Sequence, residues 1–342
     1  MNTSTLRRIV PAALAGLLIS CAAPAFAAAI DRPAAPAAPD KGAIVIGQSA
    51  PLSGSNASLG KDIRQGALAY FSKINDAGGI GGRKISLVTI DDGNDAAKAT
   101  ANTRKLLDQH NAIALFGYAS ATLSIPSMPM VKERRAPFFA PFTGAETIRK
   151  QNEFVYTVRA TYADEIGKII DFWGSLGSTR VTVLHYDDTV GIQNFETVAQ
   201  ALKKFDKSPV SVAIKRNSDL ADSSIRAIIA SNPQVVMATT LYAPVAQMVR
   251  KLKAANKQYL VTSLSFAGAN QIAKALGPDA AGISVALTVP TAQSSQVPIV
   301  KECTDAWAAL GELGNMSVTA IEGCMAAKVL VIGIRKAGRD VT

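Results

Sequence analysis

Residues 44–92 read IVIGQSAPLSGSNASLGKDIRQGALAYFSKINDAGGIGGRKISLVTIDD, and their pattern predicts the first unit of the fold. Its apolar run at 44–46 is typical of a strand buried on both faces. Residues 61–75 place apolar side chains at helical spacing, which predicts a helix, and the glycines at 78–82 end it. Residues 85–90 form a second apolar run, so the stretch predicts one βαβ unit.

The loop that follows the first predicted strand is small and polar. Residues 47–56 contain no Lys, Arg or His, and Asp91 and Asp92 end the second strand. Ligands of open α/β sheets bind at the carboxyl ends of the strands. We therefore expect a ligand site at this edge.

Strand and helix patterns continue to alternate along the chain. Further strands are expected at 113–116, 137–140, 154–158, 181–185, 210–214, 235–239 and 259–262. Helices are expected at 96–109, 124–134 and 166–177, and after each of the last four strands. Such alternation predicts an α/β fold with parallel sheets covered on both faces.

Composition limits the class of protein. A chain of 342 residues with 48% hydrophobic residues suits two domains, each with its own core. The net charge of +10 comes from basic residues dispersed along the chain. Nucleic-acid binding would require a Lys/Arg stripe interleaved with aromatic residues, which the sequence lacks. A solvated basic surface is expected instead.

The first 27 residues resemble a secretory signal peptide. Arg7 and Arg8 precede an apolar segment at 9–19, and Ala25-Phe26-Ala27 is a small-x-small cleavage motif. Cleavage there would leave a periplasmic protein whose Ala/Pro-rich residues 28–42 form a disordered tail or tether. Residues 18–21 alternatively form a lipobox, which would leave the protein anchored by a lipid on Cys21. Both interpretations remain open.

Catalytic chemistry is poorly represented. The chain has two histidines, His110 and His185, and lacks a Gly-x-Ser-x-Gly elbow and a Walker loop. The glycine cluster at 78–82 follows a helix, whereas a dinucleotide fingerprint follows a strand. His185 ends a predicted strand before two aspartates, so we expect it to face the ligand end, but no second metal ligand is near in sequence. We expect no enzyme activity, cofactor or metal.

Two later loops carry groups that suit a carboxylate. Residues 117–122 read GYASAT and residues 141–145 read PFTGA, and both follow predicted strands. Hydroxyls and backbone N–H groups in such loops can bind a carboxylate. The same hydroxyls could instead cap local turns.

An ordered series of motifs resembles the type I periplasmic binding proteins of the leucine/isoleucine/valine class. The motifs are PLSG, GGIGGR, a strand ending in DD, PFFAPFTGAETIR, YADE, RVTVLHYDDTVG and EGCMAAKVL, so the resemblance spans residues 43–342. It implies two Rossmann-like lobes joined by a hinge that the chain crosses more than once.

The resemblance also implies the lobe boundaries. Lobe one would comprise 43–160 and 291–342, and lobe two 161–290, with crossings near 159–162 and 289–298. Relatives continue past residue 342 with another helix and further strands. The sequence is therefore expected to be a fragment or to lack the last crossing, so that the C-terminal completion of lobe two is missing.

Site residues follow from matching positions in the family. Ser120 and Thr143 would hold the solute carboxylate by their hydroxyls, and Ala119, Phe142 and Gly144 by their backbone. The remaining contacts would come from the second lobe and from the mouth of the site, namely Tyr162, Val190, Tyr242, Phe266 and Leu59.

One family feature is absent. Amino-acid binders place a carboxylate, which pairs with the ligand ammonium, in the segment that matches 263–266, and here this segment reads SLSF. An unpaired buried ammonium would cost several kcal/mol. Asp164 or Asp188 could substitute, but the simpler hypothesis is a solute with a carboxylate and no amine, either aliphatic or aromatic. The choice between an amino acid and an amine-free acid stays open.

Cys303 and Cys324 both occupy predicted helices, at positions where relatives carry aromatic residues. In an oxidising compartment they could form a disulfide. Two separate buried thiols are the alternative.

The implied function is the solute-binding component of an ABC transporter, of branched-chain amino acid or related organic acid type. Two lobes would close on the solute and deliver it to a permease in the inner membrane. The protein would be a monomer without a nucleic-acid partner. A sensing module for a signalling partner would share the same fold and site.

Overall fold

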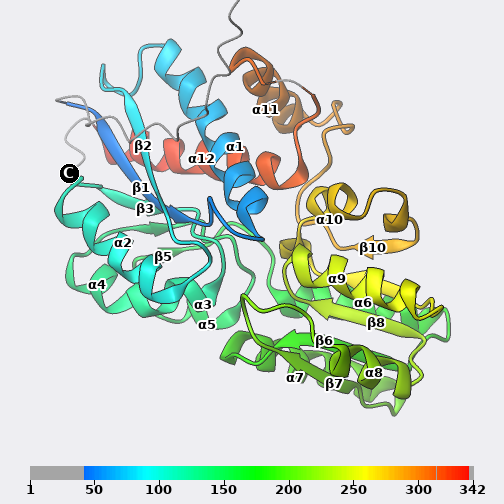
Figure 1. Cartoon of the computed structure of the whole chain (residues 1–342). Helices are drawn as coiled ribbons and strands as arrows, with labels where there is room; N and C mark the ends of the chain where they lie inside the picture. The colour runs from blue at the N-terminus through cyan, green and yellow to red at the C-terminus, as the bar shows by residue number, and fades with distance from the viewer. Residues whose placement is uncertain (1–41, 313, 339–342) are drawn as a thin grey trace, which may run out of the picture. The chain divides into compact units, whose positions relative to one another are not determined.

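The computed structural model describes residues 42–312 and 314–338, which form two five-stranded sheets (Figure 1). All strand pairs within the two sheets are parallel. The first sheet has the order β2-β1-β3-β4-β5 and the second the order β10-β9-β8-β6-β7. The α/β fold with two parallel sheets is therefore confirmed. The signal peptide and tail predicted at 1–42 lie almost wholly outside the described residues.

The βαβ unit predicted at the start of the chain is present. Strand β1 (Ile44–Ala50) pairs with β2 (Ile85–Asp91) along its whole length, with α1 (Ala57–Asp76) between them in sequence. Helix α1 begins four residues before the predicted start at Lys61. Leu59 is only 1% exposed, so burial of its side chain stabilises an additional turn.

The rest of the first sheet follows the predicted order with shorter elements. These are α2 (Ala96–Asp108), β3 (Ala114–Phe116), α3 (Ala121–Ser124), η1 (Ile125–Ser127), α4 (Met128–Glu133), β4 (Phe138–Phe139), α5 (Glu146–Arg149) and β5 (Val155–Tyr156). The helix predicted at 124–134 is present, but not as one continuous helix. Pro126 and Pro129 lack the N–H that a continuous helix requires, and the segment divides into α3, η1 and α4.

The second sheet contains one strand that the sequence did not reveal, β10. The strands of this sheet and the helices around them are α6 (Tyr162–Ser175), β6 (Val181–Tyr186), α7 (Thr189–Leu202), η2 (Lys203–Phe205), β7 (Val210–Ile214), α8 (Asp222–Ala230), β8 (Val235–Thr239), α9 (Tyr242–Ala254), β9 (Leu260–Ser263), η3 (Ser265–Ala267), α10 (Ala269–Leu276), η4 (Gly277–Ala280) and β10 (Ile283–Val285). Strand β10 has three half-buried residues, too few for a recognisable apolar run, and pairs with β9.

Two final helices return to the first sheet. Helix α12 (Val318–Ala337) lies beside α1, with α11 (Pro298–Ala309) next to them (Figure 1). Glycines allow the close approach of α1 and α12, because a Cβ at Gly66 would lie 1.9 Å from the carbonyl oxygen of Ala320. A disulfide joins Cys303 of α11 to Cys324 of α12. The chain therefore passes between the sheets after β5 and again after β10.

The apolar core continues from one sheet to the other. One cluster includes Leu59 and Tyr118 near the first sheet together with Tyr162 and Phe266 near the second. Within the described part of the chain, no helix combines the length and apolarity that crossing a bilayer requires.

Candidate functional site

Ser120 sits in a strained backbone conformation at the end of the first predicted carboxylate loop. It precedes α3 with φ 91° and ψ 139°, a combination that residues other than glycine rarely adopt. Its side chain is half-buried. Strained residues of this kind cluster at ligand sites, where the surrounding structure holds them in place.

The two predicted loops lie next to each other. Ala119 and Phe142 form a parallel bridge, and the Ser120 N–H donates to the Phe142 carbonyl oxygen at 3.3 Å. The Phe142 N–H donates to the Tyr118 carbonyl oxygen at 2.8 Å. This N–H is therefore already bound within the protein, and the contact of the Phe142 backbone with a solute carboxylate stays a prediction.

Thr143 connects this loop to the second sheet's helices. Its hydroxyl lies 3.0 Å from the hydroxyl of Tyr162, the first residue of α6, and both side chains are buried. Burial raises the pKa of Tyr162 to about 12, against the opposing effect of Arg159. The Tyr162 ring packs on Phe266 with 4.9 Å between centroids. The structure thus brings together Thr143, Tyr162 and Phe266 from three separate segments.

The other expected site residues lie around this centre in different environments. Leu59 and Val190 belong to the same apolar cluster and are buried, whereas Tyr242, at the start of α9, is half-buried. Leu59 was expected at the mouth of the site but packs in the core. Gly144 allows a close approach, since a Cβ there would lie 2.7 Å from the Ala160 carbonyl oxygen.

A buried arginine that the sequence analysis did not select lies beside these residues. The Arg159 guanidinium lies 4.3 Å from the centroid of the Phe142 ring. Its Nε is 3.2 Å from Glu322 Oε1 on α12, in an ion pair whose angle is too poor for a hydrogen bond. Its Nη2 donates to Ser265 Oγ at 2.5 Å. Nη1 is buried without a partner among the described residues.

Two carboxylates flank this arginine. Glu165 of α6 accepts hydrogen bonds from the N–H and the hydroxyl of Ser265, each at 2.8 Å. Burial raises the pKa of Glu322, and the nearby Glu165 raises it further, while Arg159 opposes both effects. Arg159 therefore lies between two carboxylates. Glu322 is on α12, which packs on the first sheet, and Glu165 is on α6, the first helix of the second sheet.

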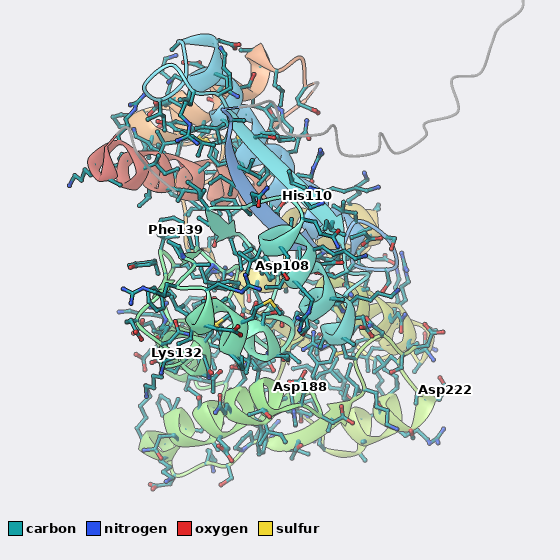
Figure 2. All side chains as sticks on the ribbon, turned by 90° about the vertical axis from the view of Figure 1, so that its left-hand side faces the viewer. Asp108, His110, Lys132, Phe139, Asp188 and Asp222 are labelled. Carbon is teal, nitrogen blue, oxygen red and sulfur yellow. A yellow bond between two sulfur atoms is a disulfide. The ribbon has the colours of Figure 1, made fainter. Side chains whose placement is uncertain are left out.

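The aspartates considered as partners for a ligand amine have other partners. Asp164 caps α6, accepting from the N–H and hydroxyl of Thr161. Asp188 forms an ion pair with Arg216 at 2.6 Å. Burial alone would raise the pKa of Asp188, but Arg216 and hydrogen bonds from Gly191 and Thr122 outweigh it and lower the pKa. Asp188 lies where the green helices of the second sheet approach the teal helices of the first (Figure 2).

His185 does not face the ligand end as expected. Its Nε2 lies 2.7 Å from Ser211 Oγ, and its Nδ1 lies 2.8 Å from the Tyr186 carbonyl oxygen. The ring stacks on Phe195 and is buried. Because side chains alternate along a strand, His185 points to the opposite face from Tyr186.

Asp92 lies in a buried polar network at the carboxyl end of β2. It is 1% exposed, and its carboxylate accepts from the Ser49 hydroxyl at 2.9 Å and the Asn94 N–H at 2.8 Å. Burial raises its pKa from 3.8 to about 6, although both hydrogen bonds oppose this shift.

Asp92→Asn is expected to change the pH dependence of stability. The folded-state pKa of Asp92 is raised, so its stabilising contribution is complete below the unfolded value of 3.8 and is lost as the pH rises through about 6. The variant should therefore gain on the order of 2–3 kcal/mol of unfolding free energy relative to wild type between pH 4 and pH 8. Urea unfolding of both proteins across that pH range measures the gain. A difference in unfolding free energy that stays constant with pH would contradict the prediction.

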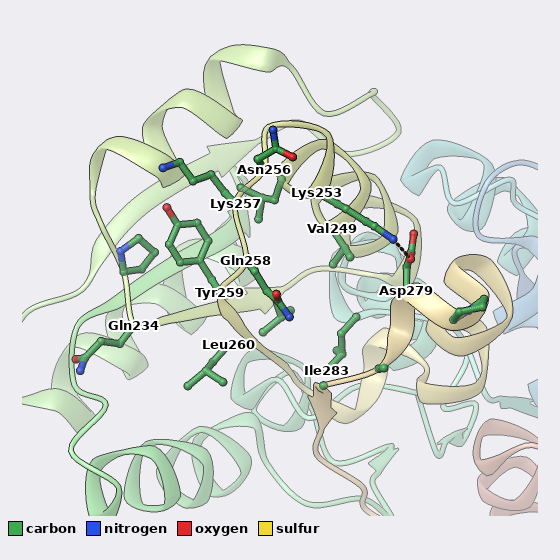
Figure 3. Close-up of a pocket in the computed structure, with 16 residues that line it drawn as sticks. Gln234, Val249, Lys253, Asn256, Lys257, Gln258, Tyr259, Leu260, Asp279 and Ile283 are labelled. Atoms are coloured by element: carbon green, nitrogen blue, oxygen red, sulfur yellow. Dashed lines mark hydrogen bonds and ion pairs between the residues drawn. The ribbon is translucent and has the colours of Figure 1, made fainter.

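A large groove lies at the amino ends of strands in the second sheet (Figure 3). It has a volume of about 990 Å³ and is lined by Gln234, Tyr259 and Ile283, which lie at the amino ends of β8, β9 and β10. Solutes of parallel α/β sheets bind at the carboxyl ends. This groove is therefore not the solute site.

Comparisons with known proteins agree with the geometry. The periplasmic binding protein family matches residues 43–342. A solved substrate-binding periplasmic protein from Ralstonia solanacearum is 31% identical with a TM-score of 0.82, covering 87% of each chain. A solved possible leucine/isoleucine/valine-binding protein from Rhodopirellula baltica is 26% identical with a TM-score of 0.83, covering 90% of this chain and 85% of the other.

A curated amino acid binding protein from Pseudomonas aeruginosa is 27% identical over 213 residues. That alignment covers 61% of this chain and 57% of the relative, so the chain matches just over half of the relative's length. These relatives bind substrates and are not enzymes. The chain belongs to the periplasmic binding protein family, in its type I leucine/isoleucine/valine class.

Proposed function

We propose that this protein is the solute-binding component of an ABC importer, and that it captures a small carboxylate by closing two lobes around it. The observation that carries the proposal is the contact of Thr143 with Tyr162 and of Tyr162 with Phe266. These residues end loops and begin helices at the carboxyl side of both sheets, where solutes of such folds bind. A permease in the inner membrane would receive the solute from the closed form.

The two lobes correspond to the two sheets. Lobe one comprises 43–160 and 291–342, and lobe two comprises 161–290. The hinge lies in the segments near 159–162 and 289–298, where the chain passes from one sheet's helices to the other's. The protein acts as a monomer in the periplasm, directed there by the signal at its N-terminus.

The solute is a carboxylic acid without an amine. Three carboxylates at the starts of α6 and α7 all have partners within the protein, since Asp164 caps a helix, Glu165 binds Ser265 and Asp188 pairs with Arg216. None of these three carboxylates is therefore free to pair with a ligand ammonium. The apolar surroundings favour an aliphatic or aromatic acid.

A matched thermal-shift screen tests this function. The probes are L-leucine with 4-methyl-2-oxopentanoate, and L-phenylalanine with phenylpyruvate. A bound probe raises the melting temperature in proportion to the logarithm of its concentration over Kd. The proposal predicts stabilisation by the oxo acids alone. Stabilisation by the amino acids would reverse the assignment of the solute, and no shift with any probe would count against the function.

Ser120→Gly is expected to stabilise the folded protein and to weaken solute binding. Glycine adopts the φ of this position without strain, so the unfolding free energy should rise by about 1 kcal/mol. Loss of the hydroxyl should weaken binding of 4-methyl-2-oxopentanoate about tenfold. Calorimetry and urea unfolding measure the two effects. Ser223→Gly, at an exposed position in α8, should instead lose about 0.5 kcal/mol and leave binding unchanged.

A further inference from the structure

Two asparagines join the first sheet's loops to those of the second. The Asn94 Nδ2 donates to Asn217 Oδ1 at 2.7 Å, and the Asn217 Nδ2 donates to the Asn94 carbonyl oxygen at 2.9 Å. Asn94 follows β2, and Asn217 follows β7. This pair of hydrogen bonds therefore links the carboxyl ends of two strands that belong to different sheets.

Both asparagines adopt a left-handed backbone conformation, in which their side-chain amides contact each other's residue. Asn94 has φ 63° and Asn217 has φ 56°, in the left-handed region that asparagine tolerates better than most residues. Asn94 is 3% exposed, and its N–H donates to Asp92. The lobe-one side of the contact is thus fixed by a buried network.

A second polar contact links the same sheets. The hydroxyl of Thr122, in α3, donates to Asp188 Oδ2 at 3.2 Å, and Arg216 Nη2 lies 3.5 Å from the same hydroxyl. Arg216 also pairs with Asp188 and lies 4.0 Å from the centroid of the Tyr186 ring. The second-sheet half of this contact is therefore rigid, so it can act as a docking point for Thr122.

We propose that these two contacts, Asn94–Asn217 and Thr122–Asp188–Arg216, form a latch that holds the lobes closed without touching the solute. The proposal rests on the proposed function, because it assumes that closure accompanies solute binding. None of the five residues is among the solute contacts that matching positions in the family imply, and Asp188, which was considered as a partner for a ligand amine, pairs with Arg216. Asn94, Asn217, Thr122, Asp188 and Arg216 are therefore positioning residues that set affinity through the population of the closed form.

The latch predicts how affinity changes when a contact is lost. A solute that binds only the closed form has an apparent Kd that rises as the closed fraction falls. Removing the two part-buried asparagine hydrogen bonds should lower the closed-to-open ratio about tenfold, since the net contribution of such hydrogen bonds is on the order of 1 kcal/mol. Both contacts act on one equilibrium, so their losses should multiply in the double variant.

The test removes each contact with a matched control. Asn217→Gly retains the left-handed backbone and deletes the amide, and Asn256→Gly does the same at φ 53°, away from the latch. Thr122→Val deletes the hydroxyl, and Thr197→Val deletes one that bonds only within α7. Spin labels at exposed Ala101→Cys in α2 and Ser223→Cys in α8 report the inter-lobe distance by pulsed electron paramagnetic resonance.

The expected result is a smaller short-distance population in Asn217→Gly and Thr122→Val than in either control, with and without 4-methyl-2-oxopentanoate. The apparent Kd of this acid should rise about tenfold in Asn217→Gly. Binding and distances equal to wild type in both latch variants would overturn the latch while leaving the proposed function intact. Failure of every probe in the solute screen would refute the function, and the distances measured without solute would still decide the latch.

Discussion

Arg159→Met is expected to lower the unfolding free energy by about 3–5 kcal/mol. The arginine side chain is 2% exposed and lies between Glu322 and the Ser265 hydroxyl that Glu165 also binds. Its removal leaves a buried carboxylate without its counter-charge, in surroundings where Glu322 already has a raised pKa. Methionine also loses the contact of the guanidinium with Phe142.

Most of the stability lost in Arg159→Met should come from the uncompensated charge of Glu322. Adding Glu322→Gln removes that charge, so the double variant should recover at least half of the lost stability. Arg134→Met removes a half-exposed ion pair with Asp108 and should cost less than about 1 kcal/mol. Urea unfolding gives the three values. Equal losses in Arg159→Met and Arg134→Met would show that the buried pair has no special role.

Cys303→Ala combined with Cys324→Ala is expected to lower the unfolding free energy by about 3 kcal/mol. The disulfide links residues separated by 21 positions, and closing a loop of this size reduces the entropy of the unfolded chain by roughly that amount. Both cysteines are fully buried against α1 and its neighbours, so lost packing adds to the effect.

Reduction provides the control for this pair. Treating the wild-type protein with dithiothreitol during urea unfolding should give most of the same loss, because it opens the loop in the unfolded state. The double variant should not respond to dithiothreitol. A wild-type midpoint that is insensitive to dithiothreitol would contradict a stabilising disulfide between α11 and α12.

The sequence predicted the two sheets because buried parallel strands are continuous apolar runs. Ile44–Ile46 and Val235–Thr239 are of this kind, and both are strands in the structure. Strand β10 was missed because three residues with a central serine carry no such pattern. The helix predicted at 124–134 is not one continuous α-helix, because Pro126 and Pro129 each stand at the start of a separate helical piece, η1 and α4.

The candidate site was only partly accessible from sequence. The loops that carry Ser120 and Thr143 could be located because they follow recognisable strands, and strand ends share one edge of a parallel sheet. Partners distant in sequence could not be located. Asn94 and Asn217 are 123 residues apart, and their local sequences carry no signal of pairing. The ion pair of Arg159 with Glu322 likewise depends on tertiary packing alone.

Small-angle X-ray scattering during titration with 4-methyl-2-oxopentanoate tests whether the two lobes close on a carboxylate solute. The predicted result is a radius of gyration that falls and saturates, with a midpoint equal to the Kd measured by calorimetry. Saturable binding at an unchanged radius of gyration would show that the solute binds without closure, which would contradict the proposed mechanism.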